Sequence, residues 1–344
     1  MKHVFWKRWG LPLILVLVFP LTIVLPKLGI INPYVDLVLK YVGINIILTV
    51  SLNLVNGYMG EFSVGHAGFM AIGAYTASLL TVWVFPRAAG PFIFPLALLA
   101  GGIAAGIAGL GIAFPSFRTR GDYLAIVTLA FVMIVKSILE NLDVVGGPRG
   151  FMGMDKLTTL AWVYICVILV IFLARNYVFS NFGRGVVSIR EDETASELVS
   201  VNSRQVKVLT FVFSAFLAGI AGGLFAHELQ FVNPRSFTIL KSTDMLVMVY
   251  LGGIGSLGGS ILGATVYTLT LEGLRTALQQ LGISQEWRLV VAPLMLILLM
   301  IFRPRGIMGL REFRFLTPHD ERLETLAEHR KQVQATKRAK EVLP

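Results

Sequence analysis

The sequence predicts an all-α protein that crosses a membrane repeatedly, with about ten transmembrane helices. Hydrophobic residues make up 55% of its 344 residues, charged residues make up only 15%, and its mean hydropathy is +0.74. Its apolar segments are long enough to approach the roughly 20 residues that an α-helix needs to cross a bilayer. They do not alternate polar and apolar residues as transmembrane β-strands do. Together these observations indicate a polytopic helical membrane protein.

Ten apolar segments divide the chain. The eighth is short and interrupted by glycines. The first follows Lys2, Lys7 and Arg8 but lacks a cleavage site of small residues, so we expect a retained span rather than a signal peptide. The predicted transmembrane domain, residues 11–302, lies between an N-terminal segment (1–10) and a C-terminal tail (303–344). The predicted spans are residues 11–31, 34–55, 66–86, 91–114, 123–142, 160–179, 208–229, 241–256, 259–281 and 286–302.

The distribution of basic residues predicts the orientation of the chain. Cytoplasmic loops carry an excess of Lys and Arg. Most of the 30 basic residues fall in the N-terminal segment, the tail and alternate loops, including the segment 180–207. Both termini and this segment are therefore predicted to be cytoplasmic. The net charge of +10 is accordingly a topology signal rather than a sign of nucleic-acid binding.

Glycine-rich breaks open the third and ninth predicted spans. Four small residues of the first break recur at the second with a constant offset of 190 residues: Gly65, Gly68, Gly73 and Ala74 match Gly255, Gly258, Gly263 and Ala264. The match indicates an internal repeat, although a chain with 34 glycines can produce it by chance. Broken helices of internal repeats line the substrate path in many transporters.

Residues at these breaks are candidates for the translocation path. Ionisable groups at membrane depth are costly and are functional candidates by default, and irregular backbone there must be covered by protein or water. Glu61 and His66 flank the first break; an interfacial pair held by packing and hydrogen bonds is the alternative. The path candidates are Glu61, Ser63, Gly65, His66, Gly68, Gly252, Gly253, Gly255 and Gly258.

Other ionisable residues in the spans are expected to be structural. Two pairs lie at spacings that allow an ion pair within one helix: Lys136 with Glu140, and Glu272 with Arg275. His227 and Glu228 are expected at the membrane interface. Asp244 is expected to cap the helix of the eighth span rather than to contact substrate.

A charged segment, residues 180–207, lies between two apolar spans and contains a predicted helix at residues 191–201. Ser188 followed by Glu191 fits a capping box, in which both side chains accept hydrogen bonds from free backbone N–H groups. Acidic residues then fill the first turn, where the helix dipole favours them. Ala195, Leu198 and Val199 form an apolar face at helical spacing. A solvated connecting loop is the alternative, but the segment is longer than a turn requires.

This segment resembles the cytoplasmic coupling helix of ABC-importer permeases, in particular of the LivM-type branched-chain amino acid permeases. Further motifs in the same order extend the resemblance over roughly residues 40–310. They are 53–60 (NLVNGYMG) continuing to 63–69 (SVGHAGF), 121–130 (GDYLAIVTLA), 146–150 (GGPRG), 219–224 (GIAGGL), 252–259 (GGIGSLGG) and 302–306 (FRPRG). The segment departs from the family in having Ala195 and Ser196 where an alanine pair is usual, and Ser200 where a later glycine is usual.

The resemblance implies a permease subunit of an ATP-driven importer of branched-chain amino acids, in the plasma membrane of a bacterium or archaeon. Family members pair with a second related permease, two ABC ATPases and an extracytoplasmic substrate-binding protein. We expect Arg190, Glu191 and Glu193 to contact the ATPase. The full set of implied coupling residues is Ser188, Arg190, Glu191, Asp192, Glu193, Ala195 and Leu198. Urea and short-chain amides are alternative substrates, because family members that carry them look alike.

The sequence carries no sign of catalysis or of a bound cofactor. It contains no Gly-x-x-x-x-Gly-Lys-Ser/Thr phosphate loop, so ATP and Mg²⁺ are expected on the partner ATPases. Its five histidines lack metal-ligand spacing, and its single cysteine, Cys166, permits no internal disulfide. An ion-coupled secondary transporter would need a midplane ion site, whereas the acidic residues of the spans are scattered and mostly have basic neighbours.

Overall fold

The computed structural model describes residues 32–85, 90–117 and 123–280, together with single residues and short runs within 19–29 and 282–316. Contacts divide the chain into two units, Met1–Glu312 and Phe313–Pro344, and every element below belongs to the first. Its helices are α2 (Pro33–Asn53), α3 (His66–Leu79), α4 (Gly90–Ser116), α5 (Tyr123–Asn141), α6 (Leu160–Phe179), α7 (Asn181–Glu191), α8 (Glu193–Leu198), α9 (Ser203–Leu229), α10 (Ile239–Gly252) and α11 (Leu257–Gln280).

Shorter elements extend or connect these helices. Two π-helical segments, η1 (Leu54–Met59) and η2 (Leu80–Val84), continue α2 and α3. The 3-10 turns are η4 (Asp143–Val145), η5 (Gly147–Arg149) and η6 (Pro234–Ser236). A two-stranded antiparallel sheet pairs β1 (Phe151–Met152) with β2 (Phe231–Val232), and its register places Phe151 opposite Val232. The sheet thus joins the segment after α5 to the segment after α9.

The structure confirms a polytopic all-α membrane protein. Six helices of the described part are long and apolar enough to cross a membrane: Pro33–Met59, His66–Val84, Phe92–Ser116, Tyr123–Asn141, Leu160–Phe179 and Ser203–Leu229. They correspond to the second to seventh predicted spans. Helices α10 and α11 occupy the positions of the eighth and ninth. The first and tenth predicted spans lie mostly outside the described residues, so the number of about ten stays a prediction.

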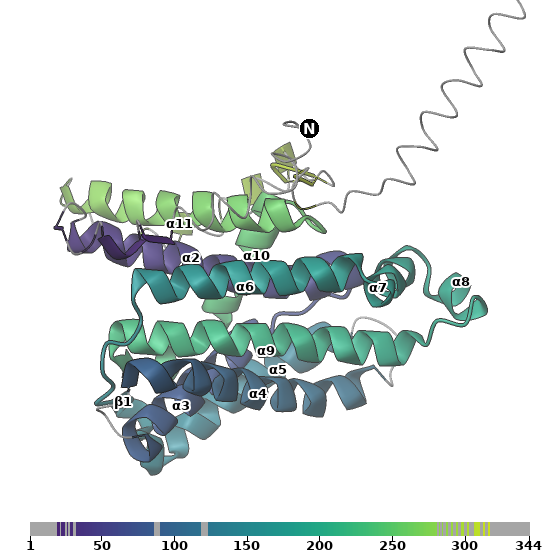
Figure 1. Cartoon of the computed structure of the whole chain (residues 1–344). Helices are drawn as coiled ribbons and strands as arrows, with labels where there is room; N and C mark the ends of the chain where they lie inside the picture. Colours follow the sequence, from purple (N-terminus) through teal and green to yellow (C-terminus); the bar gives the residue numbers. More distant parts are fainter. Residues whose placement is uncertain are drawn as a thin grey trace, which may run out of the picture. The chain divides into compact units, whose positions relative to one another are not determined.

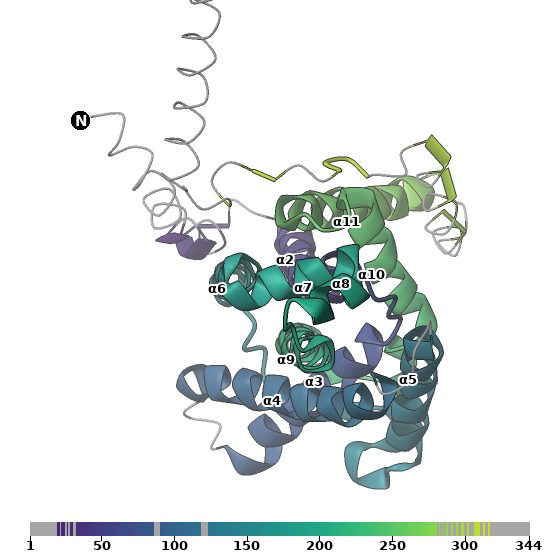
Figure 2. The same cartoon turned by 90° about the vertical axis from the view of Figure 1, so that its right-hand side faces the viewer.

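Helix α9 lies at the centre of the helical bundle (Figures 1 and 2). It packs against α3 and α4 on one side and against α2 on another, and α2 also contacts α6, α10 and α11. Small residues suit α9 to this position, since its second half is rich in glycine and alanine and is mostly buried. Helices α7 and α8 lie at one end of the bundle, and the β1–β2 pair lies at the other (Figure 1).

Glycines allow the central helices to approach one another closely. A Cβ placed on Gly73 of α3 would lie 2.2 Å from the carbonyl oxygen of Gly219 in α9, and one on Gly101 of α4 would lie 2.7 Å from the carbonyl oxygen of Gly73. Both distances are too short for non-bonded atoms, so only glycine fits. Three helices therefore meet backbone to backbone, as small residues permit in membrane proteins.

Candidate functional site

Two breaks in the helices lie where the glycines predict them. Residues 60–65 separate η1 from α3, and residues 253–256 separate α10 from α11. Gly60, Gly253 and Gly255 have φ angles of 79°, 128° and 76°, which residues with a Cβ rarely adopt. These turns interrupt the helical hydrogen bonding, so backbone groups at each break need partners from elsewhere.

Asn53, at the end of α2, connects this helix to the second break. Its side-chain oxygen accepts a hydrogen bond from the Gly255 N–H at 2.9 Å, and its amide nitrogen donates to the Ser256 carbonyl at 2.9 Å and to the Ser260 hydroxyl at 2.7 Å. Asn53 is fully buried. An amide side chain in an apolar helix needs hydrogen-bond partners when it is buried. Asn53 could therefore have been identified from the sequence as a contact between helices, but the sequence analysis did not single it out.

Residues from the predicted tail return to the second break. The carboxylate of Glu312 accepts hydrogen bonds from the first two N–H groups of α11, at 2.7 and 2.8 Å, where the helix dipole favours a negative charge. The N–H groups of Ile307 and Met308 donate to the last two carbonyls of α10. The second break is thus held from both sides, a role that the sequence analysis did not assign to these residues.

Arg190, at the end of α7, contacts η1 and also the first break, where a Cβ on Gly60 would lie 2.6 Å from its Cγ. One guanidinium nitrogen donates to the Gly57 carbonyl at 3.0 Å, and another donates to the Glu191 carboxylate at 2.6 Å. A Cβ on Gly255 would lie 2.9 Å from the same guanidinium nitrogen, so Arg190 packs against both breaks. The side chain predicted to contact an ATPase therefore lies against its own transmembrane domain, and its contact with an ATPase stays a prediction.

Lys207, in the first turns of α9, forms a second connection. Its ammonium lies 2.7 Å from the Glu61 carboxylate of the first break and 2.9 Å from the Glu193 carboxylate of α8. The side chain of Lys207 is only 10% exposed. One cation therefore joins α8 to the break between η1 and α3.

His66 and Ser63 lie in different surroundings from Glu61. His66 is fully buried, and its Nε2 lies 2.9 Å from the hydroxyl of Ser214 in α9. Ser63 donates its N–H to the side-chain oxygen of Asn56 at 3.2 Å. Glu61 and His66, the two residues expected to flank the break, thus contact different parts of α9: Glu61 contacts Lys207 in its first turns, and His66 contacts Ser214 further along.

The candidate glycines are closely packed. A Cβ on Gly65 would lie 2.9 Å from the Cβ of Thr128, and one on Gly68 would lie 2.6 Å from the ring of Phe131, both in α5. A Cβ on Gly252 would lie 1.9 Å from the carbonyl oxygen of Gly259. Close packing is therefore their evident role in this conformation, and their lining of a path stays a prediction.

The α7–α8 segment differs in detail from the helix predicted at residues 191–201. Ser180 caps α7 by accepting the Gly183 N–H at 3.1 Å, so the helix begins earlier than expected. Ser188 lies inside α7 and donates to the Gly185 carbonyl at 2.9 Å, a backbone contact that competes with capping. The predicted capping box is therefore wrong. The cap of α8 is Asp192, which accepts the Ala195 N–H at 2.9 Å.

The apolar residues of α8 face away from the bundle. Leu198 is 83% exposed and Val199 is 72% exposed, and Ala195 is also exposed. Ser196, in contrast, is buried. Helices α7 and α8 lie at the end of the bundle, with α8 outermost (Figure 1). The segment thus presents a small apolar surface, defined by Ala195, Leu198 and Val199, which we call the α8 surface.

Ser200 has a left-handed backbone, with a φ angle of 67°, at the position where the family resemblance leads us to expect glycine. For residues other than glycine, this conformation costs roughly 1–2 kcal/mol. We therefore expect Ser200→Gly to stabilise the folded chain by about 1 kcal/mol, since part of the gain is offset by the greater freedom of glycine in the unfolded state. The measurement is the midpoint of thermal unfolding in detergent. The control is Thr194→Gly, in the exposed, helical part of α8, which should lower the unfolding midpoint. A lower midpoint for Ser200→Gly would contradict the expected relief of backbone strain at Ser200.

The two predicted ion pairs within helices form. Lys136 and Glu140 lie 3.8 Å apart, and Arg275 and Glu272 lie 3.5 Å apart. Both pairs are partly exposed, where an ion pair contributes little to stability. These residues fit the structural role expected for them.

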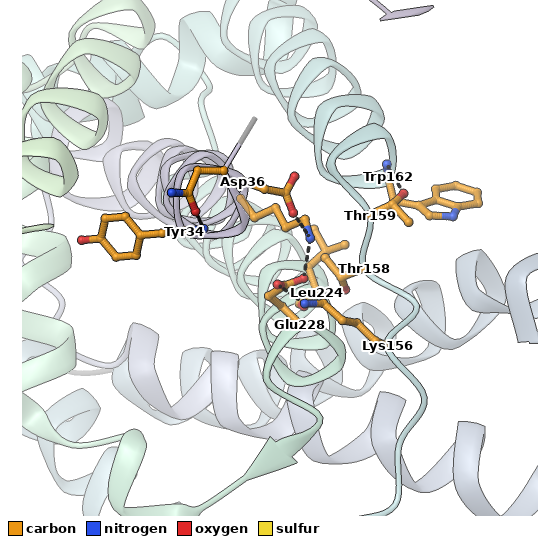
Figure 3. A network of polar contacts seen from close by, with 10 residues as sticks. Tyr34, Asp36, Lys156, Thr158, Thr159, Trp162, Leu224 and Glu228 are labelled. Atoms are coloured by element: carbon orange, nitrogen blue, oxygen red, sulfur yellow. Dashed lines mark hydrogen bonds and ion pairs between the residues drawn. The ribbon is translucent and has the colours of Figure 1, made fainter. Parts of the chain in front are cut away.

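His227 and Glu228, which the sequence analysis expected at the membrane interface, are buried within the protein near the end of α9, and their depth in the membrane stays a prediction. The Glu228 carboxylate lies 3.1 Å from the ammonium of Lys40 and 3.1 Å from that of Lys156, and Lys40 also lies 2.7 Å from Asp36. Figure 3 shows Glu228 between Lys156 and the helix that carries Asp36. This network ties α2, α9 and the segment before α6 together at the end of the bundle remote from α8. The pairing offsets the cost of burying these charges.

Asp244 is not the helix cap that the sequence analysis expected. Helix α10 begins at Ile239 after Thr238, so Asp244 lies within the helix. Its carboxylate accepts a hydrogen bond from the hydroxyl of Tyr267 in α11. The polar run at residues 241–244 (KSTD) is typical of a helix start, but the helix begins two residues before it, at Ile239.

Comparisons with known proteins agree on one family. Residues 34–300 match the family described as "branched-chain amino acid transport system / permease component". The chain is 33% identical over 300 residues to the high-affinity branched-chain amino acid transport system permease protein LivM of Escherichia coli (strain K12), covering 77% of this chain and 68% of that protein. It is 27% identical over 190 residues to the permease protein LivH of the same strain, covering 55% and 59%.

An archaeal protein is also similar. The probable branched-chain amino acid transport permease protein LivM of Methanocaldococcus jannaschii is 24% identical over 274 residues, covering 68% of this chain and 79% of that protein. No solved structure matches the chain.

Proposed function

The chain belongs to the family of branched-chain amino acid transport system permease components, and from this membership we propose that it carries branched-chain amino acids across the membrane as a subunit of an ATP-driven importer. The observation that supports this function most is the pair of connections made by Arg190 and Lys207. They link α7 and α8 to the breaks in the transmembrane helices. A movement of α8 therefore has a direct route to the broken helices.

The partner that moves α8 is a separate ATPase. The α8 surface supports this proposal because Leu198 and Val199 are strongly exposed, and exposed apolar side chains mark interaction sites when they cluster. Arg190, Glu191 and Glu193, which we expected to contact the ATPase, also make contacts within the chain. In the revised proposal, Leu198 and Val199 bind the ATPase, and Arg190 and Lys207 relay its movement.

The transporter contains a second permease, two ATPases and an extracytoplasmic binding protein in the plasma membrane of a bacterium or archaeon. The names of the Escherichia coli relatives LivM and LivH, two permease proteins described with the same high-affinity system, support two distinct permeases. Both termini and the α7–α8 segment are cytoplasmic in this arrangement, as the basic residues predict. A channel or ion-coupled transporter working alone does not account for the α8 surface.

The experiment that tests this function is uptake of radiolabelled L-leucine by vesicles that contain the chain with its partner subunits. We expect uptake that requires ATP and the binding protein, and that isoleucine and valine inhibit. Urea or short-chain amides should not compete, because all the relatives named above are described as branched-chain amino acid permeases. Leucine uptake that persists without ATP would reject the ATP-driven mechanism, and transport of urea alone would reject the substrate.

Reversing the charge of Glu191 is expected to uncouple ATP hydrolysis from transport. Glu191 is 69% exposed and holds the Arg190 guanidinium at 2.6 Å, so Glu191→Arg places two cations side by side and turns Arg190 away from Gly57. The measurement is the number of leucine molecules moved per ATP hydrolysed. Glu191→Gln, which keeps an acceptor for Arg190, should reduce the ratio less, and a wild-type ratio in Glu191→Arg would reject the role of this contact.

A further inference from the structure

A cleft opens between α2, α9, α10 and α11, in the halves of these helices remote from the α7–α8 segment. Its volume is 290 Å³, which is at the small end of the range of about 300–1,000 Å³ seen for ligand pockets. Side chains from all four helices line it. Its size suits a small solute such as a single amino acid.

The ionisable side chains of the cleft balance one another. Lys241 and Asp244 of α10 and Glu272 and Arg275 of α11 line the cleft, giving two positive and two negative charges at neutral pH. Glu272 and Arg275 pair with each other at 3.5 Å. Lys241 and Asp244 are three residues apart on α10 and so lie on the same face of the helix. One cation and one anion at this spacing complement the carboxylate and ammonium groups of a zwitterion.

Asp244 is held in place to act as an acceptor. The hydroxyl of Tyr267 donates to its Oδ1, and Tyr267 is itself 2% exposed. A carboxylate has acceptor sites on both oxygens, so this bond orients the group and leaves acceptor capacity for an ammonium. Ionisable groups within membrane-spanning helices are functional candidates, and Asp244 has no capping role to explain its presence.

Apolar side chains complete the cleft. Ile44 of α2, Leu240 of α10 and Leu271 of α11 lie in its wall, where they can contact an aliphatic side chain. Leu240 is 59% exposed, which makes it accessible to a reagent. An apolar wall beside a charge pair matches a solute with an ionic end and a branched aliphatic end.

A row of polar contacts leads from this cleft to the second break. Asn45 donates to the Thr268 hydroxyl at 2.9 Å within the cleft. Further along the same two helices, Asn53 donates to Ser260 at 2.7 Å and accepts from Gly255 at 2.9 Å. Polar contacts therefore join α2 and α11 both at the cleft and next to the break that Arg190 contacts.

We infer that this cleft binds the transported amino acid, with Asp244 accepting its ammonium, Lys241 facing its carboxylate, and Ile44, Leu240 and Leu271 contacting its side chain. The inference rests on the proposed function and identifies where in this chain the substrate binds.

Protection of an introduced cysteine tests the inference. The full chain, with Cys166→Ser to remove its one thiol and Leu240→Cys to place a thiol in the cleft, is inserted into lipid nanodiscs and treated with a negatively charged methanethiosulfonate reagent. L-Leucine should slow the labelling of this cysteine. It should not slow the labelling of Leu198→Cys on the α8 surface. Neither 4-methylpentanoate, which lacks the ammonium, nor isopentylamine, which lacks the carboxylate, should protect to the same extent.

Two charge-removing variants sharpen the test. Asp244→Asn and Lys241→Gln should each raise the leucine concentration for half-protection at least about tenfold, as expected for the loss of one charge-assisted hydrogen bond. Glu140→Gln, a matched acid-to-amide change in the partly exposed pair on α5, should leave it unchanged. Size-exclusion profiles show whether each variant folds, and Lys241→Gln carries the test if Asp244→Asn does not.

The outcomes distinguish a failure of the proposed substrate site from a failure of the proposed function. If vesicles take up leucine with ATP but leucine does not protect Leu240→Cys, the cleft is not the substrate site and the proposed function stands. Equal protection in wild-type and both charge variants would also overturn the assignment of Asp244 and Lys241. If urea protects the cysteine and leucine neither protects it nor is taken up, both the proposed substrate and this inference fail.

Discussion

Replacing Lys207 with methionine is expected to lower the leucine moved per ATP by roughly 5- to 150-fold, the range of a typical coupling free energy between two sites. Lys207 is the cation between Glu61 of the first break and Glu193 of α8. Methionine keeps a long apolar side chain but removes the ammonium, so both carboxylates lose their shared partner. The movement of α8 would then reach the broken helices only through Arg190.

The effect of Lys207→Met on transport should exceed its effect on stability. Glu61 is 22% and Glu193 is 48% exposed, so water can still solvate both carboxylates once the lysine is gone, which limits the loss of stability. The measurements are leucine uptake and ATP hydrolysis in the same vesicles. Lys136→Met, which removes a partly exposed lysine on α5, is the matched control. An unchanged ratio of transport to hydrolysis in Lys207→Met would contradict the relay.

Replacing Gly219 with valine is expected to prevent the chain from folding. A Cβ at Gly219 would lie 2.6 Å from the Cβ of Ala105 and 2.7 Å from the carbonyl oxygen of Gly101. The oxygen belongs to the backbone of α4, so space can be made only by moving α4 away from α9. Overpacking typically costs about 1–3 kcal/mol, occasionally more. The cost of this contact should lie at or above the upper end of that range, because the atom it meets belongs to the backbone and cannot rotate away as a side chain can.

The matched control for Gly219→Val is Gly111→Val. Gly111 also lies in a helix, α4, but a Cβ there meets nothing within 4 Å. The intrinsic change in helix propensity is the same for both substitutions, so a difference in folding between the two variants reports the packing contact at Gly219. We expect a single symmetric size-exclusion peak for Gly111→Val and aggregated or absent protein for Gly219→Val. Equal peaks would show that α4 and α9 separate without loss of the fold.

The sequence predicted those features that depend on local pattern. Six of the predicted spans, the two glycine breaks and the pairs Lys136–Glu140 and Glu272–Arg275 follow from hydropathy, backbone freedom and helical spacing, all of which act over a few residues. The family resemblance added the order of the motifs. These predictions hold because nothing distant in the chain competes with them.

The predictions that were wrong required knowledge of distant neighbours or of competing caps. Ser188 appeared to cap a helix, but Ser180 begins that helix earlier and Asp192 caps the next one. The burial of Glu228 was not predicted, because the lysines that pair with it, Lys40 and Lys156, lie far away in the chain.

The connections at the breaks are equally non-local. Arg190 contacts Gly57 across 133 residues, and Asn53 contacts Gly255 across 202. No spacing rule reaches so far, so these contacts follow only from the packing of the whole bundle.

Affinity purification of the full chain from its own membranes, in mild detergent, tests the central claim most directly: that the α8 surface joins this chain to a separate ATPase. Wild-type chain should bring down ABC ATPase subunits and a related permease, identified and quantified by mass spectrometry. Leu198→Asp, which places a charge on the α8 surface, should lose the ATPases and keep the permease. Gln205→Asp, at an exposed position in the first turn of α9, should keep both. ATPases recovered equally with Leu198→Asp, or a wild-type chain recovered alone that moves leucine without ATP, would contradict the claim.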